Sequence, residues 1–310
     1  ARGARGLGAV DGVLVVDKPA GPTSHDMVDR TRRAFGLRRV GHTGTLDPFA
    51  TGVLPLCLGR ATRLARFLGE GEKVYRATIR LGFATSTDDL TGIPLSDPRE
   101  VCLDKEAVRQ ALGQLVGTLD QLPPAYSARR VEGRRLYELA RRGEAVPRTA
   151  RTVTVHGIEL LEAEEDRLEI EVRCSPGTYI RALARDLGET LGVGGHLTRL
   201  RRTRSGSFGL EDAVSGDEIA GARDRLVPLG KLLPEVPVVR VGPAGRDLIR
   251  HGRDLGRDDV LAGFPEGAVE RVRILDESGD LLALAAPRRS EASGAPAVEP
   301  ALHPDLVFVG

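Results

Sequence analysis

The chain has 310 residues, of which 41% are hydrophobic, and this is enough for one large domain with a sizeable core and a second, smaller domain. Its formal net charge of +1 excludes a uniform polycation, so any surface for an anionic partner must be local. Three separated cysteines argue against a disulfide framework and a zinc site. The sequence has no long apolar run and no signal core, which predicts a cytoplasmic protein.

The N-terminal part predicts one strand and one helix. Residues 1–10 repeat arginine and glycine and are expected to be disordered. The run Gly12–Val16 predicts a strand, and Ser24 is expected to cap a helix whose apolar residues recur at helical spacing up to Phe35. The arginines between residues 30 and 39 fit either a solvated helix face or a surface that contacts phosphate.

The stretch Gly41–Arg63 presents one carboxylate in a constrained loop. Asp47 precedes Pro48, whose ring fixes its own φ and biases Asp47 toward an extended conformation. For a lone Asp-Pro pair, an ordinary turn in which the acid accepts a backbone N–H is the more common explanation. After the loop, Val53–Leu58 predicts a buried strand and Ala61–Leu68 the start of a helix.

The central part predicts a strand, an acidic loop and a helix. Tyr75 lies near the start of the predicted strand Val74–Leu81, where an aromatic ring commonly packs in a core. Thr85–Gly92 reads as a polar, acidic loop, and Asp104 is expected to cap a helix over Lys105–Val116.

Residues 123–150 combine basic and aromatic side chains after a Pro-Pro connector. Such a mixture fits contacts to RNA phosphates and bases, and it also fits a helix with a solvated basic face. The candidate phosphate ligands of this segment are Arg129, Arg130, Arg134 and Arg135.

Two strands, Arg151–Leu161 with a bulge or bend at Gly157, and Leu168–Cys174, are predicted next. A glycine turn then leads into a helix with Tyr179 and Arg181 at its N-terminus, which favours a nearby anion.

The alternation of apolar and basic residues over Gly194–Arg204 predicts an exposed basic strand edge. Its basic residues, among them Arg201 and Arg202, suit RNA phosphate or merely protect the edge. After Pro234, short strands with one helix, a hairpin turn at Asp276–Gly279 and a closing strand Leu306–Val309 predict a compact β-rich domain.

The whole string from Gly41 to Arg60 resembles the catalytic motif of the TruB family, the bacterial tRNA pseudouridine-55 synthases. Lys18–Gly21, the surroundings of Tyr75 and the string Gly177–Arg181 resemble further motifs of that family. The resemblance implies an α+β pseudouridine synthase fold, with a mixed, mostly antiparallel sheet and flanking helices. It also implies a catalytic domain over 11–234, in which the insertion 123–150 grips RNA, and a small PUA-like RNA-binding domain over 235–310.

The activity that the resemblance implies is isomerisation of uridine to pseudouridine at position 55 in the T arm of tRNA. It needs no cofactor or metal, and a cytoplasmic monomer without a protein or membrane partner is expected. A tRNA-folding role is compatible with the same surface.

Family matching also implies the roles of individual residues. Asp47 is the nucleophile on a flipped-out uridine, Arg181 pairs with it, and Tyr75 stacks on or deprotonates the intermediate. The other residues implied to contact the substrate are His42, which would occupy the space that the base leaves, Tyr179 and Leu200, and the further RNA-binding candidates are Lys18, Arg201 and Arg202.

Two alternative functions stay open from the sequence. A non-catalytic RNA-binding protein or tRNA chaperone would keep the basic segments and tolerate the loss of Asp47. A glycoside hydrolase would need a second acid, for which Asp88 and Asp89 are the candidates. The sequence also leaves open whether Asp47 adds to the base, attacks C1′ or assists elimination at C2′.

Overall fold

The computed structural model of the chain describes residues 10–102, 104–124, 130–131, 134–135, 149–288 and 301–309, with backbone alone at 130–131 and 134–135. Apart from Val10, the predicted disordered N-terminus lies outside the described residues, and so does Arg129. The chain divides into two compact units. One comprises Leu14–Cys57 and Thr62–Arg225, and the other holds Leu58–Ala61 and the chain from Leu226 onward, with the described residues before Leu14.

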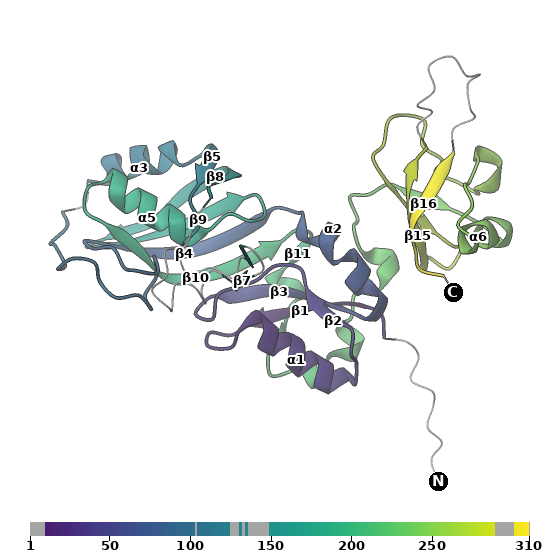
Figure 1. Ribbon diagram of the computed structural model, residues 1–310, viewed down its shortest axis with the longest axis horizontal. Coiled ribbons are helices and arrows are strands. Elements are labelled where there is room, and N and C mark those ends of the chain that lie inside the picture. Colours follow the sequence, from purple (N-terminus) through teal and green to yellow (C-terminus); the bar gives the residue numbers. More distant parts are fainter. Residues whose placement is uncertain are drawn as a thin grey trace, which may run out of the picture. The chain divides into compact units, whose positions relative to one another are not determined.

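Ten of the described strands form one sheet (Figure 1). Its order is β12-β1-β3-β10-β4-β9-β8-β5, with β2 beside β3 and β11 beside β10. The bounds are β1 Gly12–Lys18, β2 Val40–His42, β3 Thr51–Leu58, β4 Lys73–Leu81, β5 Gly117–Gln121, β8 Arg151–Glu164, β9 Arg167–Cys174, β10 Gly195–Ser205, β11 Phe208–Gly209 and β12 Val214–Ser215.

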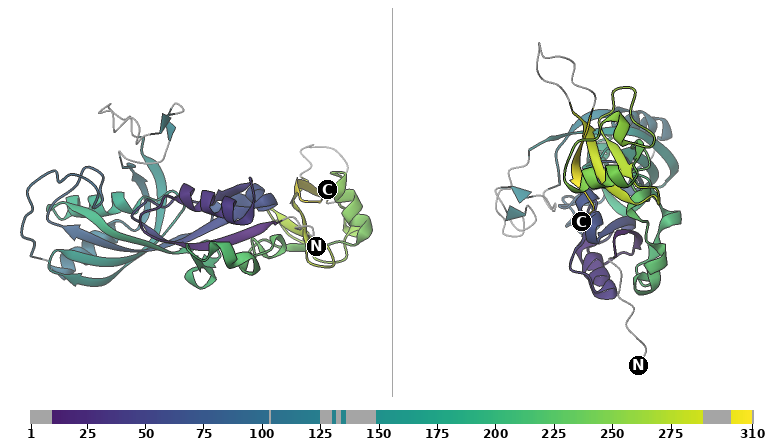
Figure 2. Two further views of the ribbon diagram at one scale, coloured as in Figure 1. Left: turned by 90° about the horizontal axis from the view of Figure 1, so that it is seen from below. Right: turned by 90° about the vertical axis from the view of Figure 1, so that its right-hand side faces the viewer.

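The sheet is mixed and mostly antiparallel, as the sequence predicted. The pairs β10–β3 and β1–β12 are parallel. The pairs β10–β4, β4–β9, β9–β8 and β8–β5 are antiparallel. Strand β3 is buried along almost its whole length, which matches its continuous apolar run, whereas β9 alternates buried and more exposed residues. Figure 2 shows the twist of this sheet from two further sides.

Helices flank the sheet. They are α1 (Ser24–Phe35), α2 (Ala65–Gly69), α3 (Lys105–Gln114) and α5 (Ile180–Thr190). Helix α5 packs on β10 and β4, and α3 packs on β8 and on α5, so both lie over one face of the sheet (Figure 1). The predicted helix Ala61–Leu68 is instead a 3₁₀ helix, Gly59–Leu64, followed by α2.

The N-terminus of α1 differs from the prediction by one residue. Thr23 is the N-cap: its hydroxyl accepts from the backbone N–H of Asp26 at 3.1 Å, and the Asp26 carboxylate accepts from the backbone N–H of Thr23 at 2.7 Å. Ser24, predicted as the cap, is buried, and its hydroxyl bonds to the backbone of Leu46 instead. The helix start is therefore tied directly to the loop that carries Asp47.

Two predictions about strands are corrected or refined. Strand β10 is not an exposed edge, because it lies between β3 and β4. Along it, Arg199 and Arg204 are exposed and Arg201 is partly exposed, whereas Arg202 is buried by the backbone carbonyls described below. The β8–β9 register shifts between Val155 and Gly157, so the bulge predicted at Gly157 is present, with His156 as the extra residue.

The described residues of the segment 123–150 include two short strands, β6 (Arg130–Val131) and β7 (Arg134–Arg135), which pair antiparallel. The side chains of Arg130, Arg134 and Arg135 lie outside the described part of the structure, so their predicted RNA contacts stay predictions.

The second unit contains a four-stranded sheet in the order β13-β14-β15-β16. Its elements are β13 Val238–Arg240, α6 Pro243–Arg250, β14 Val272–Leu275, β15 Leu281–Pro287 and β16 Leu302–Val307. A separate apolar core fills it, centred on Val239, Ile249 and Ile274. The closing strand was predicted at Leu306–Val309 but begins four residues earlier, because Leu302 and Pro304 are buried in alternation with exposed neighbours.

None of the described helices is long and apolar enough to cross a membrane.

Candidate active site

A pocket of about 390 Å³ opens in the larger unit beside the Asp47 loop. The loop, β4, β10 and the turn between β9 and α5 all contribute to it. Among the residues predicted from sequence, those that line it are Asp47, Tyr75, Tyr179, Arg181, Leu200 and Arg202. Segments more than 100 residues apart in the chain therefore converge on one cavity, and Asp47 is the sole carboxylate among its described lining residues.

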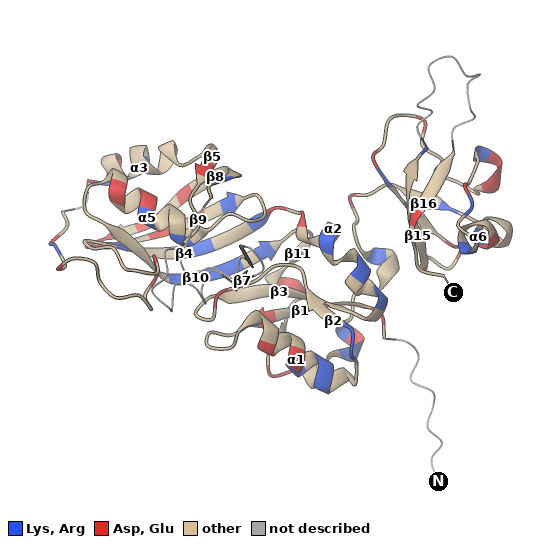
Figure 3. Ribbon diagram, viewed as in Figure 1, with Lys and Arg blue, Asp and Glu red and all other residues tan. Residues whose placement is uncertain are grey.

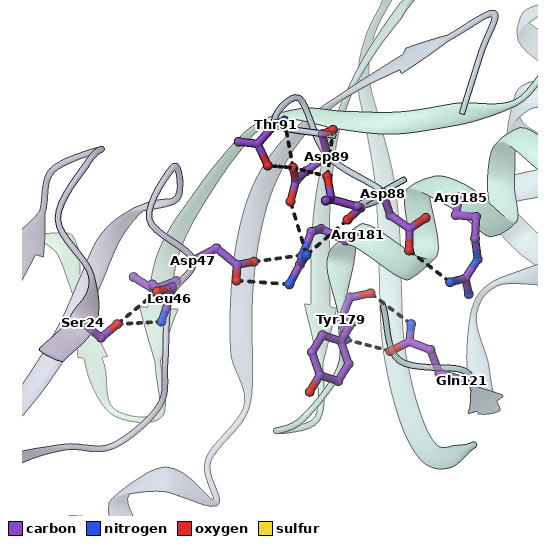
Figure 4. Close-up of polar contacts among 11 residues, drawn as sticks. Ser24, Leu46, Asp47, Asp88, Asp89, Thr91, Gln121, Tyr179, Arg181 and Arg185 are labelled. Carbon is purple, nitrogen blue, oxygen red and sulfur yellow. Dashed lines mark hydrogen bonds and ion pairs between the residues drawn. The ribbon is translucent and has the colours of Figure 1, made fainter. Parts of the chain in front are cut away.

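Arg181 and Asp47 form a side-on ion pair at the centre of the site (Figure 4). Nη2 of Arg181 donates to Oδ1 of Asp47 at 3.1 Å, and Nε lies 3.0 Å from Oδ2. The Arg181 side chain is 5% exposed, whereas that of Asp47 is 33% exposed. The planar guanidinium thus fixes the orientation of the carboxylate and leaves part of it open to a ligand.

Asp89 holds the other edge of the same guanidinium (Figure 4). Nη1 of Arg181 lies 3.3 Å from Oδ2 of Asp89 and donates to the carbonyl of Thr87 at 3.2 Å. Oδ1 of Asp89 accepts from the hydroxyls of Thr87 and Thr91 and from the backbone N–H of Thr91, at 2.7, 2.6 and 2.9 Å. Both carboxylate oxygens of Asp89 are therefore engaged in contacts within the protein, and Asp89 does not line the pocket.

The backbone of the Asp47 loop is fastened on both sides of the acid. The Ser24 hydroxyl accepts from the N–H of Leu46 at 2.8 Å and lies 3.1 Å from its carbonyl. On the other side, the carbonyl of Pro48 accepts from the N–H of Gly21 at 2.8 Å and from Nζ of Lys18 at 3.2 Å. The loop is thus prearranged before any substrate arrives.

Lys18 was predicted to contact RNA, but the structure encloses its side chain. It is 0% exposed, and its ammonium also donates to the carbonyls of Pro19 and Pro22 at 2.8 and 2.7 Å. Burial lowers the pKa of Lys18 to about 8, although the nearby Asp47 carboxylate acts to raise it. Lys18 therefore holds the backbone of the Asp47 loop and places a positive charge close to Asp47.

Arg202 is also buried, with 1% of its surface exposed, and this corrects its prediction as a surface RNA ligand. Its guanidinium donates to the carbonyls of Val53 and Gly44 at 2.7 and 3.1 Å. The approach is close because Gly52, the register partner of Arg202, has φ +104°, and a Cβ there would lie 2.1 Å from the Arg202 carbonyl oxygen. Arg201, in contrast, keeps 40% of its side chain exposed and pairs with Asp17 at 2.7 Å, outside the pocket.

Tyr75 projects from β4 into the pocket and is 8% exposed. Burial raises the pKa of its hydroxyl, while the neighbouring Arg202 guanidinium acts to lower it. The phenol is therefore protonated near neutral pH. It can stack on a base, donate a hydrogen bond, and lose its proton only to a reaction that supplies the driving force.

His42 ends β2 and precedes the first pocket-lining residue, Thr43, without lining the pocket itself. Its Nδ1 is buried and has no hydrogen-bond partner among the described residues. Burial lowers the pKa of His42, so the ring is neutral near neutral pH. A neutral ring suits stacking better than phosphate binding.

Gln121 fixes the wall of the pocket at Tyr179 and was not predicted from the sequence. It ends β5, is 3% exposed, and uses both atoms of its amide on one backbone residue. Its Oε1 accepts from the N–H of Tyr179 at 2.7 Å, and its Nε2 donates to the Tyr179 carbonyl at 3.1 Å (Figure 4). Tyr179 is the N-cap of α5 and has no side-chain cap of its own, so this pairing sets where the helix begins.

Opposing influences act on the pKa of Asp47. Burial is the largest and raises it, the Arg181 guanidinium lowers it, and the Asp89 carboxylate raises it. The net direction is upward from the ordinary carboxyl value. The acid is consequently a better nucleophile or base than an ordinary surface carboxylate, provided that the pH keeps it ionised.

The positions of the acidic side chains argue against glycoside hydrolysis by a pair of acids. Double-acid glycoside hydrolysis needs a second carboxyl group facing the bond to be broken. Asp89 is bound to Arg181, and Asp88 is bound to Arg185 at 3.1 Å, so neither candidate acid faces the pocket. In the part of the chain that the structure describes, no group of three or more His, Cys, Asp or Glu side chains could hold a metal ion.

The fold and the site together define a class of protein. Lys and Arg residues recur along β10 and the neighbouring β4 (Figure 3), a composition that suits a polyanionic substrate. Among solved structures, the chain matches one titled an H/ACA RNP bound to a substrate RNA containing 2′-deoxyuridine, with TM-score 0.72 and 27% identity over 96% of this chain and 85% of that one. It matches an archaeal box H/ACA sRNP Nop10-Cbf5 complex with TM-score 0.71 and 27% identity over 99% and 89%. The chain therefore has the pseudouridine synthase fold.

The particular family follows from two sequence models and from close relatives. Residues 32–180 match the N-terminal domain of the TruB family pseudouridylate synthases, and residues 181–227 match the tRNA pseudouridylate synthase B C-terminal domain. The chain is 45% identical to tRNA pseudouridine synthase B of Burkholderia pseudomallei over 93% of this chain and 96% of that protein. It is 44% identical to the protein of the same name from Solibacter usitatus, over 89% and 95%. The chain belongs to the TruB family and is a tRNA pseudouridine synthase.

Proposed function

We propose that this protein isomerises uridine 55 in the T arm of tRNA, with Asp47 as the group that reacts with the flipped-out nucleotide. The observation that carries the proposal is the partly exposed Asp47 carboxylate. Arg181 holds it side-on in a pocket with no other acid among its described lining residues. The reaction breaks the C1′–N1 bond and joins C1′ to C5, so one oriented carboxylate can serve both halves of it.

The roles of the other residues follow from their positions. Arg181 keeps Asp47 ionised and oriented, because each shares two contacts with the other. Tyr75, Tyr179 and Leu200 supply the walls against which a uracil ring can turn. Of the two phenols that line the pocket, Tyr75 is the one that acts on the intermediate: it stacks on the uracil or, once its own proton has passed to solvent, takes up the C5 proton as the product forms.

A uridine within the T loop must leave the stack before it can reach Asp47. His42 precedes the pocket-lining Thr43 and is neutral, so we place its ring in the space that the base vacates. The basic segment 123–150 would grip the rest of the arm, and the four-stranded unit after Leu226 would act as a PUA-like RNA-binding module.

The test is pseudouridine mapping on an unmodified tRNA transcript and on its isolated T-arm hairpin. The unaltered protein should convert position 55 in both and leave other uridines unchanged. Asp47→Asn should reduce the rate by at least about 10⁴-fold, the scale seen when a covalent nucleophile is removed, while the dissociation constant for the hairpin changes little.

Conversion at a different uridine would contradict the proposed T-arm specificity. Turnover by Asp47→Asn within about tenfold of the unaltered protein would contradict the role of the acid. Binding and refolding of tRNA by the unaltered protein without any conversion would instead support the chaperone alternative.

A further inference from the structure

The pocket wall carries one cation that no described side chain or carbonyl engages. Four cationic residues line the pocket: Lys73, Arg151, Arg181 and Arg202. Arg181 is paired with two carboxylates, while Lys73 and Arg202 are buried and donate to backbone carbonyls. The Arg151 side chain is exposed, and among the described residues it makes neither a hydrogen bond nor an ion pair.

Arg151 is nevertheless held in a defined place. It is the first residue of β8 and lies opposite Gln121 of β5 in the antiparallel register, so both side chains leave the same face of the sheet. One of its terminal nitrogens lies 3.8 Å from the position that a Cβ of Gly177 would occupy. Gly177 has φ +84° and belongs to the turn that leads to Tyr179. The guanidinium is therefore placed against the turn at the start of α5.

The charge inside the pocket makes this position informative. Asp47, Arg181 and Asp89 form a cluster with two carboxylates and one guanidinium, so its formal charge is −1. Lys18, Lys73 and Arg202 add positive charges around this cluster, but each of them is buried and donates to backbone carbonyls. A polyanionic substrate that inserts one nucleoside into this pocket therefore gains most from a cation at the pocket wall that has no internal partner among the described residues.

Base flipping leaves the flanking phosphates at the rim of the pocket, and Arg151 is an exposed residue of the pocket lining. When a nucleotide rotates out of the stack, its base and ribose enter the pocket, and the phosphates on either side stay near the entrance. A guanidinium presents two parallel N–H groups that match two phosphate oxygens. We propose that Arg151 binds, through such a two-point contact, one backbone phosphate that flanks the extruded uridine.

This inference rests on the proposed function. It gives a ligand to Arg151, a residue to which neither the sequence motifs nor the ion pairs of the site assign a role. The contact would set the depth to which the nucleotide enters, because phosphate contacts fix register and carry no base information. It would be present equally in the bound ground state and in the transition state.

The experiment uses the full chain and three forms of a T-arm hairpin. One form is unmodified, and the other two carry a neutral methylphosphonate at the linkage immediately 5′ or 3′ of the target uridine. Dissociation constants are measured for the unaltered protein, Arg151→Gln, Arg151→Lys and a control, Arg167→Gln. The control arginine is 68% exposed on the neighbouring strand β9 and does not line the pocket.

With the unmodified hairpin, Arg151→Gln should bind about 10- to 100-fold more weakly, the range for a lost charge-assisted contact. Arg151→Lys should lose less, because it keeps the charge and loses the two-point geometry. The slope of log affinity against log salt should fall by about one unit for Arg151→Gln. Arg167→Gln should match the unaltered protein, and kcat should change little for every variant.

The modified hairpins locate the contact. One of the two methylphosphonates should weaken binding to the unaltered protein and have no further effect on Arg151→Gln. If the losses from the variant and from both modifications multiply independently, or if Arg151→Gln binds as the unaltered protein does, the inference is wrong. Conversion of the unmodified hairpin by the unaltered protein is scored separately and tests the proposed function, because these binding constants do not depend on turnover.

Discussion

Asp89→Asn should impair catalysis although Asp89 does not line the pocket. The substitution preserves shape but removes the charge that faces Nη1 of Arg181 at 3.3 Å, between two side chains that are each 5% exposed. An asparagine has one carbonyl oxygen, which cannot serve both Arg181 and the donors of Thr87 and Thr91. At least one buried donor therefore loses its acceptor.

The size of the effect can be worked from these contacts. A hydrogen bond to a charged group contributes about 1.5–3 kcal/mol, and the guanidinium keeps its two contacts to Asp47. If the lost contact appears as imprecise placement of Arg181, the chemical step should slow by roughly 10- to 100-fold. The affinity for the hairpin should change by less than about threefold, because Asp89 is not among the pocket-lining residues.

The pH dependence of the rate provides a second, independent test of the role of Asp89. The Asp89 carboxylate raises the pKa of Asp47, so neutralising it should lower that pKa. If the acidic limb of the rate profile reports ionisation of Asp47, the limb should move to lower pH in Asp89→Asn even though the maximal rate is smaller. Single-turnover rates are measured between about pH 5 and 8 by the release of tritium from C5 of the uridine. They give both the maximal rate and the position of the acidic limb.

Asp88→Asn is the matched control. Asp88 is the neighbouring acid, pairs with Arg185 instead of Arg181, and has φ +60°, a conformation that asparagine tolerates. Its rate should fall less than that of Asp89→Asn, and its acidic limb should not move. Equal losses in the two variants, or a limb that shifts upward in Asp89→Asn, would refute the reasoning.

Two further substitutions test the pocket wall. Tyr75→Phe keeps the ring and removes the hydroxyl, so the chemical step should slow by about 10² to 10⁴-fold with little change in melting temperature; an unchanged single-turnover rate would leave the ring with a packing role alone. Gln121→Glu replaces the donor to the Tyr179 carbonyl with a carboxylate and should lower kcat by about tenfold near neutral pH, with Gln114→Glu on the exposed face of α3 as the control. The introduced carboxyl group can donate again once it is protonated, so the relative rate of this variant should recover as the pH falls, and a deficit that is constant with pH would argue against the contact.

The residues that carry chemistry were predictable because they lie in short contiguous strings. The Asp47 loop and the turn before Arg181 each combine glycine or proline with one functional side chain, and the structure joins them in one ion pair. Charge alone did not reveal burial. Lys18 and Arg202 were predicted to bind RNA, yet both are buried and donate to backbone carbonyls.

Other features could not be read from the sequence for a physical reason. Gln121 bonds to the backbone of a residue 58 positions away, and a partner that is backbone leaves no pattern in the side chains. Strand β10 was predicted to be an edge because basic residues alternate along it, but strand order depends on pairings such as β10–β3 and β10–β4 that join distant segments.

The separation of Asp47 and Arg181 also has a consequence for how activity arises in time. The two residues are 134 positions apart, and the sheet between them must pair β4 with both β9 and β10 before they can meet. Contacts of such long range form late, because the entropy of closing the intervening chain must be overcome first. A chain emerging from the ribosome therefore cannot act until α5 has docked. In refolding, recovery of turnover should lag behind recovery of secondary structure, which makes catalysis itself a reporter of the completed sheet.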